Sequence, residues 1–318
     1  MAALHEVDAV EILSLQDNYI DVLTMDSSDV VQRPALLSKT SDHAGDLLNS
    51  PLAEHGYSAF ITVTFGDDKK SMLFDFGCSE RGAAFNAELL AVDLTQVDEL
   101  ALSHGHFDHF GGMEELVRLT GKRDLELVAH PAAFKERFVK TPSGLALAFP
   151  KLRRDEVQKM GIRIHETTSP HKMLDNHALF LGEIPRKTSF EKGMPNAFYL
   201  EKGEQHHDVI EDDSSMVFVL RDKGLVVLSG CAHAGIINTV KHAQSVTGVS
   251  DIYAIMGGFH LSGPFYEQFI GQTVEALQAL SPKYIVPAHC TGRKATQAIE
   301  SAMTDAFICN MSGTTMKF

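Results

Sequence analysis

The sequence predicts an α/β protein in which β-sheets pack face to face and helices cover the outside. Hydrophobic residues make up 44% of the 318 positions, enough for a large core. Short apolar runs joined by turns fill the first part of the chain, and similar runs alternate with helical segments in the last part. This mixture favours a sheet sandwich with helices on its outer faces. We interpret residues 1–318 as a single domain with an insertion around residues 140–213.

Strands and short helices account for the chain up to residue 130. Residues 58–65 and 70–76 are rich in β-formers and flank the turn Gly66-Asp67-Asp68, which predicts a hairpin. The segment 113–121 has helical apolar spacing and ends at Gly121. In all, we expect strands at residues 7–15, 58–65, 70–76, 97–103 and 124–130, and helices at 83–92 and 113–121.

The middle of the chain shows little regular periodicity. Residues 140–213 contain Pro and Gly breaks, short apolar runs and the polar stretch EKGEQHHDVIEDDSS. We interpret them as inserted loops and strands around the opening of a site. His206 and His207, within the polar stretch, are expected on a solvated face.

Regular structure resumes near residue 215. The runs SMVFVLRD and GLVVLSG predict a hairpin that turns at Asp222-Lys223-Gly224. We expect further strands at residues 251–258 and 283–290, and helices at 233–248, 265–280 and 293–305.

Charge and targeting signals limit the partners. A net charge of −14 argues against duplex DNA, which binds clustered Lys and Arg, so we expect no nucleic-acid partner. A phosphorylated small molecule stays compatible, because bound cations invert the local field. The acidic N-terminus lacks an apolar h-region, and no apolar run approaches ~18 residues. We therefore expect a cytoplasmic protein without a membrane partner, and the sequence leaves the oligomeric state open.

The strongest chemical signal is the segment Ser103-His104-Gly105-His106-Phe107-Asp108-His109. In an extended strand end, residues i and i+2 point the same way, so His104 and His106 can bind one ion. Asp108 and His109 follow the bend and can reach a second ion nearby. Chance would produce this pattern in roughly three sequences per thousand of this composition. We expect a metal site at the end of this strand.

Other apolar strands also end at residues that bind metals. The strand VVLSG is followed by Cys231 and His233, and the strand KYIVPAH ends at His289. Zinc accepts both imidazole and thiolate, so we predict these three residues as further ligands. Cys231 has a competing interpretation as a small buried hydrophobic residue, and we expect Cys290 to pack rather than to bind metal.

Two further residues are candidates for supporting roles. Asp75, at the end of the strand in LFDFG, is suited to orienting a ligand histidine, although Asp is also common in turns. His260, in GGFHL, could line the substrate pocket or bind a substrate oxygen, and a structural role for this histidine is an equal alternative.

The motifs GYSAFITV, LFDFG, NAELL, LSHGHFDHFGGM, LSGCAHAGIIN, GGFHL and PAHCTG resemble the metallo-β-lactamase superfamily. Among its branches they are most similar to the one labelled dihydropterin-ribofuranosylaminobenzene 5′-phosphate synthase-like, or metal-dependent hydrolase of the β-lactamase superfamily II. The similarity runs from about residue 10 to residue 292.

The resemblance implies an αββα sandwich, with two mixed sheets and an active site at one edge between them. It also implies that His104, His106, Asp108, His109 and His289 bind metal. The chain departs from the usual pattern at two places. Gly182-Glu183 stands where a Gly-His pair is common, and Ser229-Gly230-Cys231 stands at a T-G-D-like turn. His233 could supply the missing imidazole, and Cys231, Glu183 or solvent could bridge the two ions.

We therefore predict a hydrolase with two divalent ions, zinc first and manganese or iron as alternatives. A metal-activated hydroxide would attack a small phosphoester, ester or related substrate, and Asp108 would act as the catalytic base. Two alternatives stay open from the sequence. One is an iron-dependent oxidoreductase on the same scaffold, and the other is a non-catalytic metal- or ligand-binding sensor.

Overall fold

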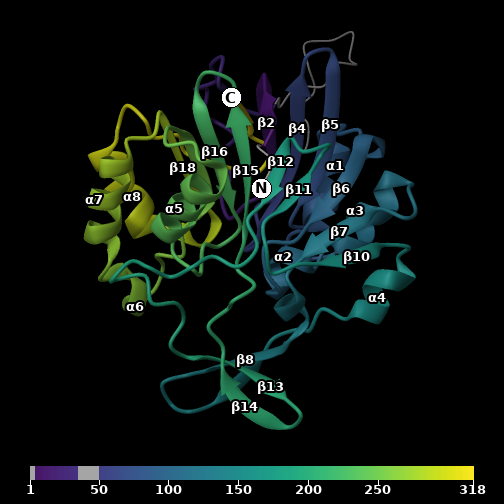
Figure 1. Cartoon of the computed structure of the whole chain (residues 1–318), viewed down its shortest axis with the longest axis vertical. Coiled ribbons are helices and arrows are strands. Elements are labelled where there is room, and N and C mark those ends of the chain that lie inside the picture. Colours follow the sequence, from purple (N-terminus) through teal and green to yellow (C-terminus); the bar gives the residue numbers. More distant parts are fainter. Residues whose placement is uncertain (1–3, 35–49) are drawn as a thin grey trace.

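Two β-sheets pack face to face in the computed structural model, which describes residues 4–34 and 50–318 (Figure 1). The first sheet has the order β11-β12-β15-β16-β17-β18, and β1 pairs with β15. Its strands are β1 (Glu6–Val7), β11 (His171–Met173), β12 (Ala178–Phe180), β15 (Ser215–Leu220), β16 (Gly224–Ser229), β17 (Ile252–Gly258) and β18 (Tyr284–Ala288).

The second sheet has the order β10-β7-β6-β5-β4-β2-β19-β3. Its strands are β2 (Ala9–Gln16), β3 (Val31–Gln32), β4 (Ser58–Phe65), β5 (Asp68–Phe74), β6 (Val97–Ala101), β7 (Glu126–Ala129), β10 (Arg163–Glu166) and β19 (Thr315–Lys317). Both sheets contain parallel and antiparallel pairs. In the second sheet, β4 and β5 are antiparallel whereas β5, β6 and β7 are parallel. In the first sheet, β15 and β16 are antiparallel whereas β16, β17 and β18 are parallel.

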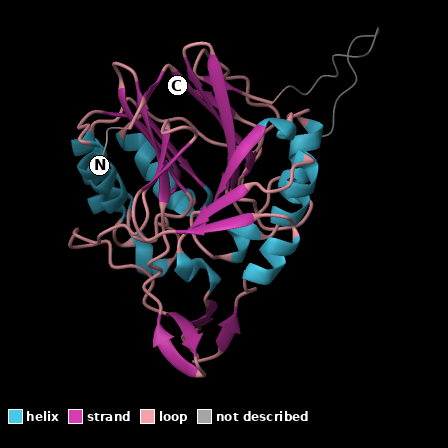
Figure 2. Ribbon diagram, turned by 45° about the vertical axis from the view of Figure 1, so that its right-hand side comes forward, coloured by secondary structure: helices cyan, strands magenta, loops and turns pink. Residues whose placement is uncertain are grey.

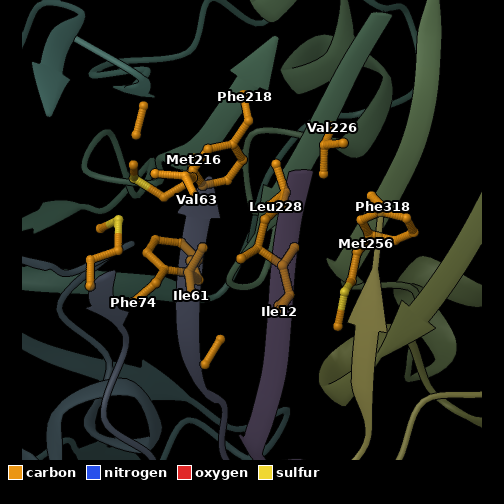
Figure 3. Close-up of a cluster of buried hydrophobic side chains, with 14 of the residues drawn as sticks. Ile12, Ile61, Val63, Phe74, Met216, Phe218, Val226, Leu228, Met256 and Phe318 are labelled. Atoms are coloured by element: carbon orange, nitrogen blue, oxygen red, sulfur yellow. The ribbon is translucent and has the colours of Figure 1, made fainter. Parts of the chain in front are cut away.

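The central core lies between the two sheets. Ile12 and Ile61 reach into it from the second sheet, and Phe218 and Leu228 reach into it from the first (Figure 3). These side chains are fully buried. They come from alternate positions of β2, β4, β15 and β16, as expected for strands with one face on the core.

Helices cover the outer face of each sheet (Figures 1 and 2). The helices are α1 (Gly82–Leu89), α2 (Phe107–Phe110), α3 (Met113–Thr120), α4 (Arg154–Lys159), α5 (Ile236–Thr247), α6 (Pro264–Glu267), α7 (Ile270–Leu280) and α8 (Arg293–Ala302). Buried residues of α5, α7 and α8 pack on the first sheet, and those of α1 and α3 pack on the second. This arrangement confirms the predicted α/β sandwich with helices outside.

A smaller sheet extends from one end of the sandwich (Figures 1 and 2). It consists of β8 (Glu136–Lys140), β9 (Ala146–Ala148), β13 (Ala197–Glu201) and β14 (Glu204–His207). The strands of the segment 140–213 are therefore divided between the projecting sheet and the two main sheets. Its β9, β13 and β14 belong to this projecting sheet, whereas its β10, β11 and β12 join the two main sheets.

Most predicted elements agree with the structure to within a few residues. The hairpin at 58–76 is present, with Phe65 opposite Asp68 at its turn. The predicted helix at 233–248 begins later, at Ile236, because residues before it form a loop. The single helix predicted at 265–280 was wrong, since α6 ends at Glu267 and α7 starts at Ile270.

The topology brings the carboxyl ends of parallel strands to one edge of the sandwich. In the first sheet, β16, β17 and β18 run parallel, and the loops after them carry Cys231, His260 and His289. In the second sheet, the segment after β6 carries the histidine-rich motif. Among the described residues, no helix combines the length and apolarity needed to cross a membrane.

Candidate metal centre

The segment His104–His109 begins three residues after β6 and ends within α2. His104 and His109 are fully buried, and His106 and Asp108 are each 7% exposed. The strand VDELA that precedes them is buried at its end, so the chain holds these polar side chains inside the protein. Burial of four such groups together is costly unless they bind something or pair with each other.

Close backbone packing requires two glycines, one inside this segment and one just after it. A Cβ at Gly105 would lie 1.9 Å from the carbonyl oxygen of Ala133, and a Cβ at Gly111 would lie 1.7 Å from that of Cys78. No side chain fits at such distances, because real Cβ contacts stay above about 3 Å. The glycines therefore let the motif fold tightly against its neighbours.

The first group of converging side chains is His104, His106 and His233. One ring nitrogen of each lies within 4.8 Å of the others. His233 Nε2 lies 3.2 Å from His106 Nδ1, and these two residues come from opposite sheets. His104 Nε2 is buried and has no hydrogen-bond partner among the described residues. Three imidazole nitrogens thus face a common point.

The second group surrounds Asp108. Its Oδ2 lies 3.4 Å from His289 Nε2 and 3.9 Å from His109 Nε2. His289 belongs to the 3-10 turn His289–Thr291 at the end of β18. His55 was not predicted from the sequence, yet its Nε2 also lies 3.4 Å from Asp108 Oδ2. A carboxylate and several imidazoles therefore meet next to the first group.

Cys231 lies between the two groups. Its Sγ is 3.1 Å from His109 Nε2. The thiol also falls within 4.8 Å of candidate ligand atoms in three sets, which pair it with His104 and His109, with His233 and His260, and with His289 and Cys290. This central position is compatible with the bridging role that the sequence left open.

Asp75 holds His109 from behind. Its buried carboxylate accepts a hydrogen bond from the Ser103 backbone N–H at 2.7 Å, and its Oδ2 lies 2.7 Å from His109 Nδ1. Ser103 Oγ donates to the same carboxylate at 2.7 Å and lies 2.9 Å from His104 Nδ1. Because a carboxylate only accepts, Nδ1 of His109 keeps its proton in the neutral ring, and Nε2 offers its lone pair to the centre once it has lost its own proton, as metal binding requires.

His289 has its own supporting residues, which the sequence analysis missed. Its Nδ1 lies 3.1 Å from Asn18 Oδ1, and its backbone N–H donates to Asp17 Oδ1 at 2.7 Å. Asp17 and Asn18 immediately follow β2. The rule that identified His289, a polar residue just after an apolar strand, would have found them as well.

The backbone at several of these positions adopts a conformation that is uncommon for residues with a side chain. Asp75 has φ 59°, Ala232 has φ 54°, and His260 and His289 each have φ 46°. Non-glycine residues in the left-handed region are strained by about 1–3 kcal/mol and concentrate at functional sites. The strain here lies at the carboxyl ends of the strands that carry the candidate ligands.

Electrostatics keep most of the rings neutral. Burial lowers the pKa of His104 and His233 well below the usual range, and burial with the nearby Arg137 lowers the pKa of His106 to about 3. A neutral imidazole has a lone pair for a cation, so these shifts favour metal binding over charge pairing.

Around Asp108, by contrast, neighbouring charges favour the charged forms of the side chains. Burial opposes charge on His109, yet Asp75 and Asp108 raise the pKa of this ring to about 9. Burial likewise opposes charge on Asp108, but His109 and His289 hold its pKa well below the usual range. Asp108 is therefore ionised near neutral pH.

These donor atoms are suited to binding divalent metal. Several imidazoles, the carboxylate of Asp108 and the thiol of Cys231 converge, and His104 Nε2 is buried without a hydrogen-bond partner in the described chain. Such atoms are costly unless something binds them. Nitrogen, oxygen and sulfur donors together are typical of zinc and of iron.

The centre opens into a cavity of about 310 Å³. Its lining includes the apolar side chains Phe107, Phe149 and Met194 and the polar side chains Asn18 and His55. Among the described residues, no lysine or arginine lines it. A larger surface hollow of about 550 Å³, lined by charged side chains near α3, shares none of these residues.

The two remaining candidate residues, His260 and Glu183, line different cavities. His260 lines the cavity of the centre, and its ring centroid lies 4.0 Å from that of His233. Glu183 lies elsewhere, in a cavity of about 250 Å³ together with Arg186 and Glu211. Glu183 is therefore not among the side chains that converge on the centre.

A buried ion-pair network supports the histidine motif from the projecting sheet. Arg137 on β8 contacts Asp208 at 2.7 Å and Asp212 at 2.5 Å. Asp212 Oδ2 in turn accepts the backbone N–H of Gly105 at 2.7 Å. No local pattern in the sequence predicts this network, because Arg137 lies more than 70 residues before both of its aspartate partners.

Comparison with known proteins agrees with this geometry. The sequence model of the "Metallo-beta-lactamase superfamily" matches residues 54–289. The "7,8-dihydropterin-6-methyl-4-(beta-D-ribofuranosyl)-aminobenzene-5′-phosphate synthase" of Methanocaldococcus jannaschii is 34% identical, over 87% of this chain and 94% of that protein. An uncharacterized protein of the same organism is 29% identical, over 76% of this chain and 86% of its own length.

A solved structure has a similar fold. It is the crystal structure of Tm1679, described as a metal-dependent hydrolase of the beta-lactamase superfamily. The TM-score is 0.71 with 22% identity, and the match covers 97% of this chain and 98% of that one.

Proposed function

The chain belongs to the metallo-β-lactamase superfamily, and we propose that it is a metal-dependent hydrolase of small esters or phosphoesters. The observation that carries the proposal is the meeting of His104, His106 and His233 next to Asp108, His109 and His289. Divalent ions held by these residues would lower the pKa of water and polarise the scissile group.

We assign the candidate ligands to two adjacent ions. His104, His106 and His233 would hold one, Asp108, His109 and His289 would hold the other, and Cys231 would lie between them. Zinc suits imidazole and thiolate donors best, and iron or manganese are the alternatives. Asp75, Ser103 and Asn18 fix the ring orientations through the hydrogen bonds described above.

Asp108 is the proposed general base. It is ionised at neutral pH, and its Oδ2 faces the cavity side chains His55 and His289. A carboxylate in this position can accept a proton from an attacking water, and its low pKa means that it passes the proton on rather than keeping it. His55, whose side chain is 64% exposed, can exchange that proton with solvent.

The cavity favours a substrate with an apolar or aromatic part. Phe107, Phe149 and Met194 offer it an apolar wall. Without lysine or arginine in the lining, a phosphoryl group would be neutralised at the metal centre itself. His260 lies beside His233 at the cavity wall, and we propose that it contacts the substrate.

A second candidate function comes from the relative in Methanocaldococcus jannaschii. Its name describes a synthase whose product contains a ribofuranosyl-aminobenzene 5′-phosphate, and the match spans 94% of its length. A bond-forming reaction on a phosphorylated aromatic substrate is therefore the alternative to hydrolysis for this chain.

Turnover of chromogenic substrates tests the proposal. We expect the zinc-loaded protein to hydrolyse p-nitrophenyl esters or bis(p-nitrophenyl) phosphate, and His106→Ala or Asp108→Asn to reduce the rate at least about 100-fold, or roughly 2.7 kcal/mol of barrier. His207→Ala, on the exposed strand β14, is the matched control. Retention of activity within about threefold in both site variants would refute the mechanism. Absence of hydrolysis, with coupling of a pterin to a ribofuranosyl-aminobenzene 5′-phosphate instead, would favour the synthase.

A further inference from the structure

A second buried thiol adjoins the proposed metal centre. Cys290 follows His289 in the same 3-10 turn and is 8% exposed. It lines the 310 Å³ cavity together with Cys231, although the two residues come from different strand ends. The sequence predicted only a packing role for Cys290, so the proximity of two thiols is a property of the fold.

The distances suit a shared ion. The sulfur atoms of Cys231 and Cys290 and a ring nitrogen of His289 all lie within 4.8 Å of one another. Ligand atoms on one tetrahedral zinc, with bonds of about 2.0–2.3 Å, are roughly 3.3–3.8 Å apart. The three donors can therefore close on one ion with small side-chain shifts.

The backbone of the adjacent strand leaves room for the thiol of Cys290. A Cβ at Gly258 would lie 2.6 Å from Cys290 Sγ and 2.4 Å from the carbonyl oxygen of Gly230. Any residue other than glycine at the end of β17 would displace this sulfur. The thiol thus occupies a space that only glycine provides, beside Cys231.

Cys290 Sγ donates a hydrogen bond to the backbone carbonyl of Cys231 at 3.5 Å, and His260 lines the same cavity as both thiols. His260 Nδ1 is itself buried and has no hydrogen-bond partner in the described chain. Ring nitrogens of several histidines thus lie within 4.8 Å of one or both thiols, whereas a packing cysteine is expected among apolar side chains.

We propose that Cys290 is a metal ligand alongside Cys231, so that the two thiolates and His289 form a sulfur-rich edge of the metal centre. This inference rests on the proposed metal-dependent function. Thiolate ligands favour zinc, cobalt and iron over magnesium and manganese. The chain therefore selects an ion of the zinc class at this edge.

Cobalt substitution provides the test, with a readout independent of activity. Cobalt(II) bound to thiolate shows a sulfur-to-metal charge-transfer band in the near ultraviolet. We expect this band in the cobalt-loaded protein, a fall of about half in Cys290→Ser and in Cys231→Ser, and its loss in the double variant. Cys309→Ser, a free cysteine that does not line the cavity, should leave it unchanged.

A full-intensity band in Cys290→Ser, with cobalt content equal to that of the parent, would overturn the inference. Cadmium-113 NMR of the unsubstituted protein avoids dependence on the folding of variants. A resonance in the range of two-thiolate coordination supports the proposal, and its absence contradicts it. If the protein did not bind cobalt at all, both the inference and the proposed function would be contradicted. If His106→Ala bound cobalt as well as the parent, only the proposed function would be contradicted.

Discussion

Asp75→Asn is a sharp test of how the centre is held together, because the substitution changes one oxygen to nitrogen without changing volume. Asp75 is fully buried and accepts hydrogen bonds from the Ser103 backbone N–H, Ser103 Oγ and His109 Nδ1, each at 2.7 Å. An asparagine can accept from the backbone N–H only if its NH₂ faces His109. The ring must then accept at Nδ1 and carry its proton on Nε2, which faces Cys231 and Asp108.

The expected effect follows from this change of tautomer. His109 would no longer offer a lone pair to the centre, and loss of such an orienting carboxylate typically weakens metal binding 10–100-fold, or about 1.4–2.8 kcal/mol. Competition for zinc against a chromogenic chelator measures the affinity. Asp67→Asn, in the exposed turn between β4 and β5, is the control. If Asp75→Asn bound zinc within about threefold of the parent, our account of the support of His109 would be wrong.

Three further predictions concern the scaffold. Gly105→Ala should abolish zinc binding in a dialysis assay, because its Cβ would lie 1.9 Å from the Ala133 carbonyl oxygen, and normal zinc content would contradict this packing. Phe218→Ala should destabilise the protein by about 3–5 kcal/mol in urea denaturation, as expected for a fully buried ring between the sheets; a loss below about 1 kcal/mol would argue against the sandwich core. Burial raises the pKa of the Glu191 carboxyl above its ordinary 4.5. The folded state therefore binds this proton more tightly than the unfolded state does, and the free energy of unfolding should fall as the pH rises from 4.5 to the pKa of the folded state. In Glu191→Gln this fall should be smaller, and an unchanged pH profile from urea titrations would count against the shift.

The local sequence was enough to predict the histidine motif and its position at the end of a strand. The spacing of His104, His106 and Asp108 is a local property, and so is the apolar strand before it. The ends of β16 and β18 could be read in the same way, which is why Cys231, His233 and His289 were correctly expected at strand ends.

Contacts between distant segments were harder to predict. Asn18 supports His289 across 271 residues, and Arg137 reaches Asp212 across 75. Neither pair has a periodic signature, because each depends on how separate sheets and loops are placed. His55 precedes a strand rather than following one, so the rule used for the other residues did not apply to it.

Two differences have physical explanations in the packing. Glu183 was considered only because of its place in a motif comparison, and the fold directs it into a separate cavity with Arg186. The helix expected at 265–280 is divided into α6 and α7, and the two parts pack in different places. Tyr266 on α6 packs edge-on against His260 at 4.5 Å, whereas α7 buries Val274 and Leu277 against the first sheet.

Anomalous X-ray scattering at the zinc edge, from crystals of the zinc-loaded protein, tests the central claim most directly. Our account predicts two neighbouring peaks, one among His104, His106 and His233, and the other among Asp108, His109 and His289. Zinc bound elsewhere, with no anomalous density between these side chains, would contradict it.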